Sequence, residues 1–115
     1  MNIASFNEAL TFSDKKIVVS VLLESSFTKE IRILLKKGQS MKEHKSPFAI
    51  VVHILEGEID FGVAGTIHSM SKGSIIALEG NVPHDLSAQQ DSVVRLTLSK
   101  LDKSERVATV AKDSI

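Results

Sequence analysis

The feature that most constrains this chain is a series of short, β-branched apolar runs, which turn signals interrupt about every 8–12 residues. The clearest runs cover residues 17–23, 28–35, 48–55, 59–63, 67–70, 75–78 and 93–98. Within 59–63 the residues alternate, which places Ile59, Phe61 and Val63 on one face of an extended strand. We therefore expect about eight antiparallel strands in an all-β sandwich or barrel. A parallel sheet is excluded because no helical stretch separates the runs.

Length and composition fit one domain with a packed core. The chain has 115 residues, of which 43% are hydrophobic, so disorder is a poor interpretation. Its 14 Lys and Arg balance 14 Asp and Glu, which argues against nucleic acid or an anionic membrane as a partner. The absence of Cys excludes disulfides, thiolate metal sites and a cysteine nucleophile. The four His residues are His44, His53, His68 and His84.

We expect the chain to divide into an N-terminal segment at 1–16, a barrel at 17–99 and a C-terminal tail at 100–115. The first segment has neither a basic start nor an unbroken apolar run, and no run approaches the roughly 20 residues of a bilayer span. We therefore expect a cytoplasmic protein. The tail is polar with scattered Val and Ala, and it fits either a short helix or a loose end.

Two segments of the chain combine glycine and histidine at defined spacings. In the first, five residues separate Gly38 from His44, and Gly57 closes the segment. In the second, Gly73 leads into a segment that ends in Pro-His, at His84. In their spacings and their order, with a short segment of hairpin length between them, the two resemble the paired motifs of the cupin family.

The resemblance covers about residues 17–98 and implies an all-β, antiparallel double-sheet jelly-roll barrel. The resemblance places Gly57 and Gly73 in tight turns that need a positive φ or a close backbone approach. Asn81 occupies a family glycine position, and Asn tolerates the left-handed conformation best among the other residues. Because small barrels of this family commonly pair, the resemblance also implies a homodimer. Surplus apolar strand positions that could serve it are Val18, Val21, Leu23, Leu34 and Val93.

The family's metal ligands are two His and a Glu from the first motif and one His from the second. The corresponding positions here are His44, Ser46, Ile50 (or Val51) and His84. The resemblance therefore implies two imidazoles, a hydroxyl and an aliphatic chain, which is a depleted site. A divalent metal such as Zn, Ni, Fe or Mn could bind weakly through the two His alone.

A third ligand would have to come from one of the other histidines. His53 should point outward, because strand alternation turns Val52 and Ile54 inward. His68 shares a face with Met70 and could lie inside, but it belongs to the hairpin between the motifs, away from the ligand cluster. Two histidines hydrogen-bonded to each other, to Ser46 or to water at a barrel mouth would explain the residues equally well.

We expect a protein that binds or senses a small molecule without catalysis. The expected ligand pocket is formed by His44, Ser46, Phe48, Ile50, Phe61 and His84. One alternative is a metal-dependent oxygenase or isomerase that uses His44 and His84 with a non-standard third ligand. Another is metal-free acid/base catalysis with His84 as the base, for which Glu79 and Asp85 are the nearest acids in sequence.

A basic cluster flanks His44 in the sequence and consists of Lys36, Lys37, Lys42 and Lys45. Glu30 and Glu43 are near it, so a solvated surface explains the charges. The same lysines could also attract an anionic ligand.

Overall fold

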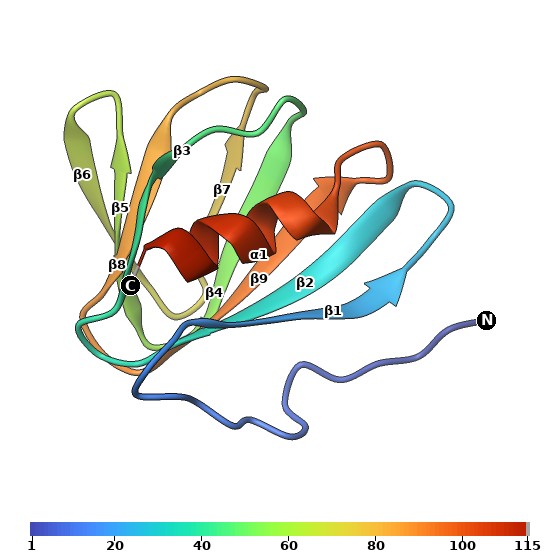
Figure 1. Ribbon diagram of the computed structural model, residues 1–115, viewed down its shortest axis with the longest axis horizontal. Helices are drawn as coiled ribbons and strands as arrows, with labels where there is room; N and C mark the ends of the chain where they lie inside the picture. Colours follow the sequence, from blue (N-terminus) through green and yellow to red (C-terminus); the bar gives the residue numbers. More distant parts are fainter. Residues whose placement is uncertain (115) are drawn as a thin grey trace.

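Two antiparallel sheets and one helix form the computed structural model, which describes residues 1–114 (Figure 1). The elements are β1 (Val18–Glu24), β2 (Thr28–Leu35), β3 (Ser40–His44), β4 (Ile50–Glu56), β5 (Glu58–Val63), β6 (Thr66–Ser71), β7 (Ile75–Leu78), β8 (His84–Ala88), β9 (Ser92–Ser99) and α1 (Ser104–Asp113). One sheet has the order β1-β2-β9-β4-β7, and the other has the order β3-β8-β5-β6. The expected all-β architecture of antiparallel strands is confirmed.

The core lies between the facing sheets and follows the alternation of the strands. In β4, Ile50, Val52 and Ile54 are buried, whereas Val51 and His53 are only half-buried. From the other sheet, Ile59 and Phe61 of β5 are fully buried in the same core. The outward direction expected for His53 is therefore confirmed, because it alternates with three core residues.

Three turns have the backbone conformation that the sequence predicts. Gly57 between β4 and β5 has φ +88°, Gly73 before β7 has φ +92°, and Asn81 before β8 has φ +66°. At Gly57 a Cβ atom would also collide with Ser92 and with the carbonyl oxygen of Asp91. Glycine is thus required at Gly57 both by the positive φ and by the close approach of the β8–β9 turn.

The structure adds one strand, β3, to the predicted strands, and it shows the conformation of the C-terminal tail. β3 was not predicted, because its sequence SMKEH holds one buried apolar residue, Met41. The tail forms α1, which lies across one end of the space between the sheets (Figure 1). Val107 and Ala111 are its buried residues, and Val110 packs partly against the core. In the described part of the chain, no helix is long and apolar enough to cross a membrane.

The N-terminal segment is tied to the outer face of the β1–β2–β9 sheet by Arg32. Its guanidinium donates hydrogen bonds to the backbone carbonyls of Phe6 (3.4 Å), Glu8 (2.5 Å) and Ala9 (3.3 Å). Leu34 and Val93 are buried although they lie outside the core between the sheets. The chain itself therefore covers two of the five apolar positions that suggested a homodimer. The dimer stays a prediction, which light scattering would test through a mass above that of one chain.

Candidate functional site

His44 and His84 meet at one end of the sheet that contains β3 and β8. The two residues are paired in the β3–β8 register, next to an irregularity in β3. Their ring centroids are 4.3 Å apart, and the ring planes are inclined by 62°. Residues that are 40 positions apart in the sequence motifs thus form one imidazole pair, as the resemblance implied.

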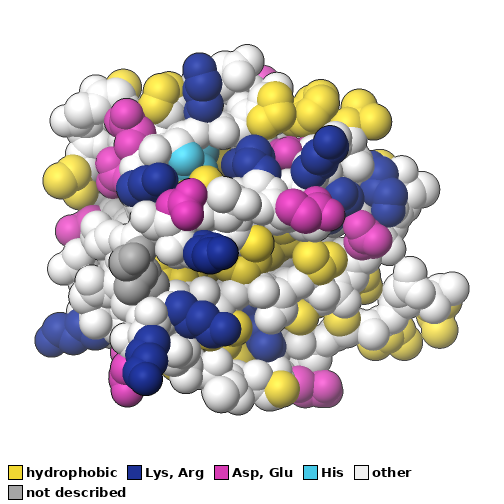
Figure 2. Space-filling model, viewed as in Figure 1, with side chains coloured by type: hydrophobic (Ala, Val, Ile, Leu, Met, Phe, Trp, Pro, Cys, Tyr) yellow, Lys and Arg dark blue, Asp and Glu magenta, His cyan; other side chains and the backbone are white. Residues whose placement is uncertain are grey.

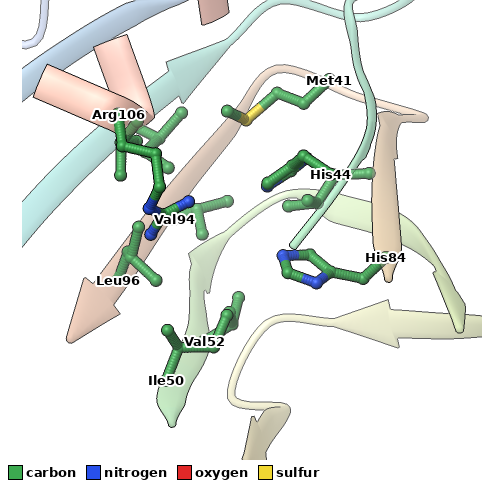
Figure 3. Close-up of a pocket in the computed structure, with 11 residues that line it drawn as sticks. Met41, His44, Ile50, Val52, His84, Val94, Leu96 and Arg106 are labelled. Carbon is green, nitrogen blue, oxygen red and sulfur yellow. The ribbon is translucent and has the colours of Figure 1, made fainter. Parts of the chain in front are cut away.

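The hydrogen bonds of the two rings determine which nitrogen faces the interior. Nδ1 of His44 donates to the carbonyl oxygen of Lys42 at 2.7 Å, and Nδ1 of His84 donates to the carbonyl oxygen of Val82 at 2.9 Å. A carbonyl oxygen can only accept, so each Nδ1 carries the proton, and Nε2 of the neutral ring keeps a lone pair. Figure 3 shows both rings turned toward a shared cavity. The pair therefore presents two hydrogen-bond acceptors rather than a bond between the rings.

The surroundings keep both rings neutral. Burial lowers the pKa of His84 and of His44, and this outweighs the hydrogen bond that each ring makes to a backbone carbonyl. His84 and then Arg106 lower the pKa of His44 further, and Arg106 also lowers the pKa of His84. The charge of Asp85 raises both pKa values and offsets part of this effect. Phe61 stacks on His84 with ring planes within 6° of parallel and centroids 5.6 Å apart, so it fixes the ring's orientation.

The cavity in front of the imidazoles is small and mainly apolar. It offers about 20 Å³, which is room for little more than one water molecule. Its walls come from β2, β3, β4, β8, β9 and α1. The lining residues are Ile33, Met41, His44, Ile50, Val52, His84, Leu86, Val94, Leu96, Arg106 and Val107.

Arg106 brings a fixed positive charge to this cavity from α1 (Figure 3). Its Nε and Nη2 donate to the two carboxylate oxygens of Asp102 at 3.1 and 2.8 Å. Asp102 is buried and also accepts a hydrogen bond from Ser46 Oγ at 2.7 Å. Burial alone would raise the pKa of Asp102, but the bonds from Arg106 and Ser46 prevail and lower it, so the carboxylate is ionised.

The residues predicted to form the pocket occupy different places. His44, Ile50 and His84 line the cavity. Ser46 is buried next to Asp102, Phe61 lies behind His84, and Phe48 is half-buried without reaching the lining. The suggestion that His68 could lie inside is wrong: its side chain is exposed near the free edge of β6, although it pairs with Phe61 in register.

The chain matches the family model described as "Cupin domain" over residues 31–100. It belongs to the cupin family. Solved structures agree with this cupin's fold. An RmlC-like cupin protein from Desulfovibrio desulfuricans is 25% identical, with a TM-score of 0.76 over 86% of this chain and 96% of that one. A cupin 2 conserved barrel domain protein from Leptotrichia buccalis is 29% identical, with a TM-score of 0.71 over 81% of this chain and 45% of that one. No curated protein matches this cupin.

The donor set of this cupin does not fit the metal that the family implies. Among residues 1–114 no group of three His, Cys, Asp or Glu side chains comes together. At the two other ligand positions, Ser46 donates a hydrogen bond to Asp102 and Ile50 is aliphatic. Arg106 also places a positive charge in the same cavity. A catalytic metal centre generally needs three protein ligands. Weak binding of a divalent metal by the two imidazoles alone stays a prediction.

Sequence reasoning missed Arg106, the residue that most changes the character of the site. Its position depends on where α1 docks, and the apolar residues of the tail are too few to reveal that. One local signal was present, because Asp102 and Arg106 are four residues apart, as in a helical ion pair. The pair indicates a helix but not the cavity that the guanidinium faces.

A second, larger hollow lies on the other side of α1, between the helix and β1. Its floor is apolar, with Ile17, Val19 and Ala111, and lysines stand at its rim. In Figure 2 apolar side chains are visible in a hollow across the middle of this face, with Lys and Arg side chains around it. The imidazole pair does not line this hollow.

Proposed function

We propose that this cupin binds a small organic molecule between its two sheets, beside His44, His84 and Arg106, and serves as a binding or sensing protein. The observation that carries the proposal is the convergence of three polar groups on one apolar cavity. An apolar site with a few oriented polar groups is the usual form of a small-molecule site.

The absence of an acid from the cavity favours binding over acid/base catalysis. Among residues 1–114, no carboxylate is part of the lining. Glu79 is exposed, and Asp85 lies on the opposite face of β8 from His84, where it packs over Gly62. A base such as His84 would need a partner acid for epimerisation, and neither candidate is placed to provide it.

The cavity must enlarge to accept an organic molecule, and α1 is the element that can move. Only Val107 and Ala111 of the helix are fully buried, so lifting this part costs about 2–4 kcal/mol of apolar burial. A ligand that fills the vacated space regains this cost through its own burial. Asp102 is held by Ser46 and by the backbone amide of Lys103, so the start of the helix stays in place.

A thermal-shift screen tests the proposal, with binding confirmed by calorimetry. The panel holds small carboxylic acids, their primary amides, and the corresponding alcohols, together with Zn²⁺ and Ni²⁺ salts. The variant Val52→Phe fills the cavity, since Val52 lines it. Ile76→Phe is the matched control, because Ile76 packs against the core but does not line the cavity.

We expect members of the organic panel to raise the melting temperature of the wild type and of Ile76→Phe, but not of Val52→Phe. Stoichiometric tight binding of Zn²⁺ that is lost in His44→Ala would instead support the metal-dependent alternative. If no organic compound binds the wild type, the proposed function is wrong.

A further inference from the structure

We infer that the ligand is a small 2-hydroxy acid, whose carboxylate pairs with Arg106 and whose hydroxyl donates a hydrogen bond to Nε2 of His44 or His84. This inference rests on the proposed function and names the chemical class of the ligand. It follows from the hydrogen-bond donors and acceptors that the cavity offers.

Arg106 offers donors that no other residue in the described part of the chain uses. A guanidinium has five N–H donors in a planar fork, and Asp102 takes one from Nε and one from Nη2. The remaining edge is the one that can take a second carboxylate in a bidentate pair. Asp102 cannot turn away from Arg106, because Ser46 and the backbone amide of Lys103 hold its oxygens. The carboxylate of Asp102 thus orients the guanidinium for an anion.

The two imidazoles need a hydrogen-bond donor from the ligand, whereas Arg106 needs an acceptor. Each Nδ1 is committed to a backbone carbonyl, so each Nε2 presents a lone pair to the cavity. A carboxylate alone would place its own lone pairs against them. A ligand that satisfies both sides therefore needs an O–H donor next to its carboxylate, and a 2-hydroxy acid has this arrangement on adjacent carbons.

The walls limit the rest of the ligand. Val52, Val94 and Leu96 face the cavity, so the substituent on the hydroxyl-bearing carbon must be apolar and small. Outside the cavity, the exposed side chains of Lys42 and Lys45 flank His44 and favour the approach of an anion, although Glu43 between them offsets part of this charge.

Isothermal titration with three compounds of nearly equal size tests the inference at fixed ionic strength. Lactate has both groups, propionate lacks the hydroxyl, and lactamide lacks the charge. We expect lactate to bind about tenfold or more tightly than either of the other two, since each loses one hydrogen bond in a buried site.

The variant Arg106→Gln should remove the preference for lactate over lactamide while keeping the preference of hydroxyl-bearing compounds over propionate. Arg106→Lys should retain part of the charge preference. Lys112→Gln, an exposed position on the same helix, should change nothing. Because the loss of Arg106 leaves Asp102 unpaired, the double variant Asp102→Asn/Arg106→Gln repeats the measurement if the single variant does not fold.

Equal binding of lactate and propionate, or of lactate and lactamide, would overturn the inference and leave the proposed function standing. The same holds if only neutral compounds of the wider panel bind. If no compound of either panel binds, the proposed function fails and the inference fails with it.

Discussion

Ser46 donates a hydrogen bond from Oγ to Oδ2 of Asp102 at 2.7 Å, and both residues are buried. Ser46 stands where the cupin motif has its second His ligand, and Asp102 lies two residues before α1. Ser46, at a position where the family has a metal ligand, thus fixes the start of the helix that closes the cavity. Through Asp102 the same buried contact also holds Arg106, which lines the cavity.

Replacing Ser46 by Ala should destabilise the protein by about 1–3 kcal/mol, because the buried carboxylate of Asp102 loses a donor that nothing else replaces. The free energy of unfolding from urea denaturation measures this. Ser40→Ala is the matched control, since the Ser40 hydroxyl pairs with Ser87 at the surface, and it should stay within about 0.5 kcal/mol of wild type. An equal loss in both variants would contradict the anchoring role of Ser46.

Stability should fall as the pH drops below 6.5, the usual His value. Burial lowers the pKa of His44 and of His84 in the folded state. As the pH falls, these two rings therefore bind protons in the unfolded chain before they do so in the folded protein. The contribution of the two neutral rings to the free energy of unfolding is complete above their pKa in the unfolded chain. It is lost as the pH falls through their pKa in the folded protein. Asp102 and Glu30, whose pKa values are also lowered, lose their contributions only below their usual values of 3.8 and 4.5.

The variant His44→Gln/His84→Gln should flatten the dependence of unfolding free energy on pH between about 7 and 5. The exposed residue His68 provides the control, and His68→Gln should keep the wild-type slope. A wild-type slope in the double variant would show that the imidazole pair is not the source.

The sequence predicted the strands best where alternation was strong and the site best where the motif spacing applied. The run at 50–55 alternates clearly, and its orientation follows, including the outward direction of His53. The resemblance to the cupin motifs implied that His44 and His84 lie together, and their rings do. β3 was missed because one buried Met41 is too little signal, and Arg106 was missed because helix docking depends on tertiary contacts. His68 was misjudged because a shared strand face does not guarantee burial near the free edge of a sheet.

Gly57→Ala and Gly65→Ala should differ although both positions have a positive φ, +88° and +78°. At Gly65 the space for a methyl group is open, so only the backbone strain of about 1 kcal/mol applies. At Gly57 the methyl group meets Ser92 and Asp91 as well, and the loss should be several kcal/mol. Thermal unfolding compares the two, and equal losses would contradict the close approach of the β8–β9 turn.

Arg32→Met should release the N-terminal segment, because Arg32 supplies three hydrogen bonds to its backbone carbonyls. We expect a loss of about 1–3 kcal/mol and rapid proteolysis near residues 6–9. Lys36→Met is the control: it removes the exposed ion pair to Asp14 of the same segment and should leave the cleavage rate unchanged. Equal rates of proteolysis in the wild type and in Arg32→Met would show that other contacts hold the segment.

The most direct test of the binding site is a long-range ¹H–¹⁵N spectrum of the four imidazole rings at about pH 7, recorded with and without lactate. The account predicts that His44 and His84 carry their proton on Nδ1, and that lactate shifts their Nε2 resonances while those of His53 and His68 stay in place. A proton on Nε2 of either interior ring, or Nε2 resonances that no lactate concentration moves, would contradict it.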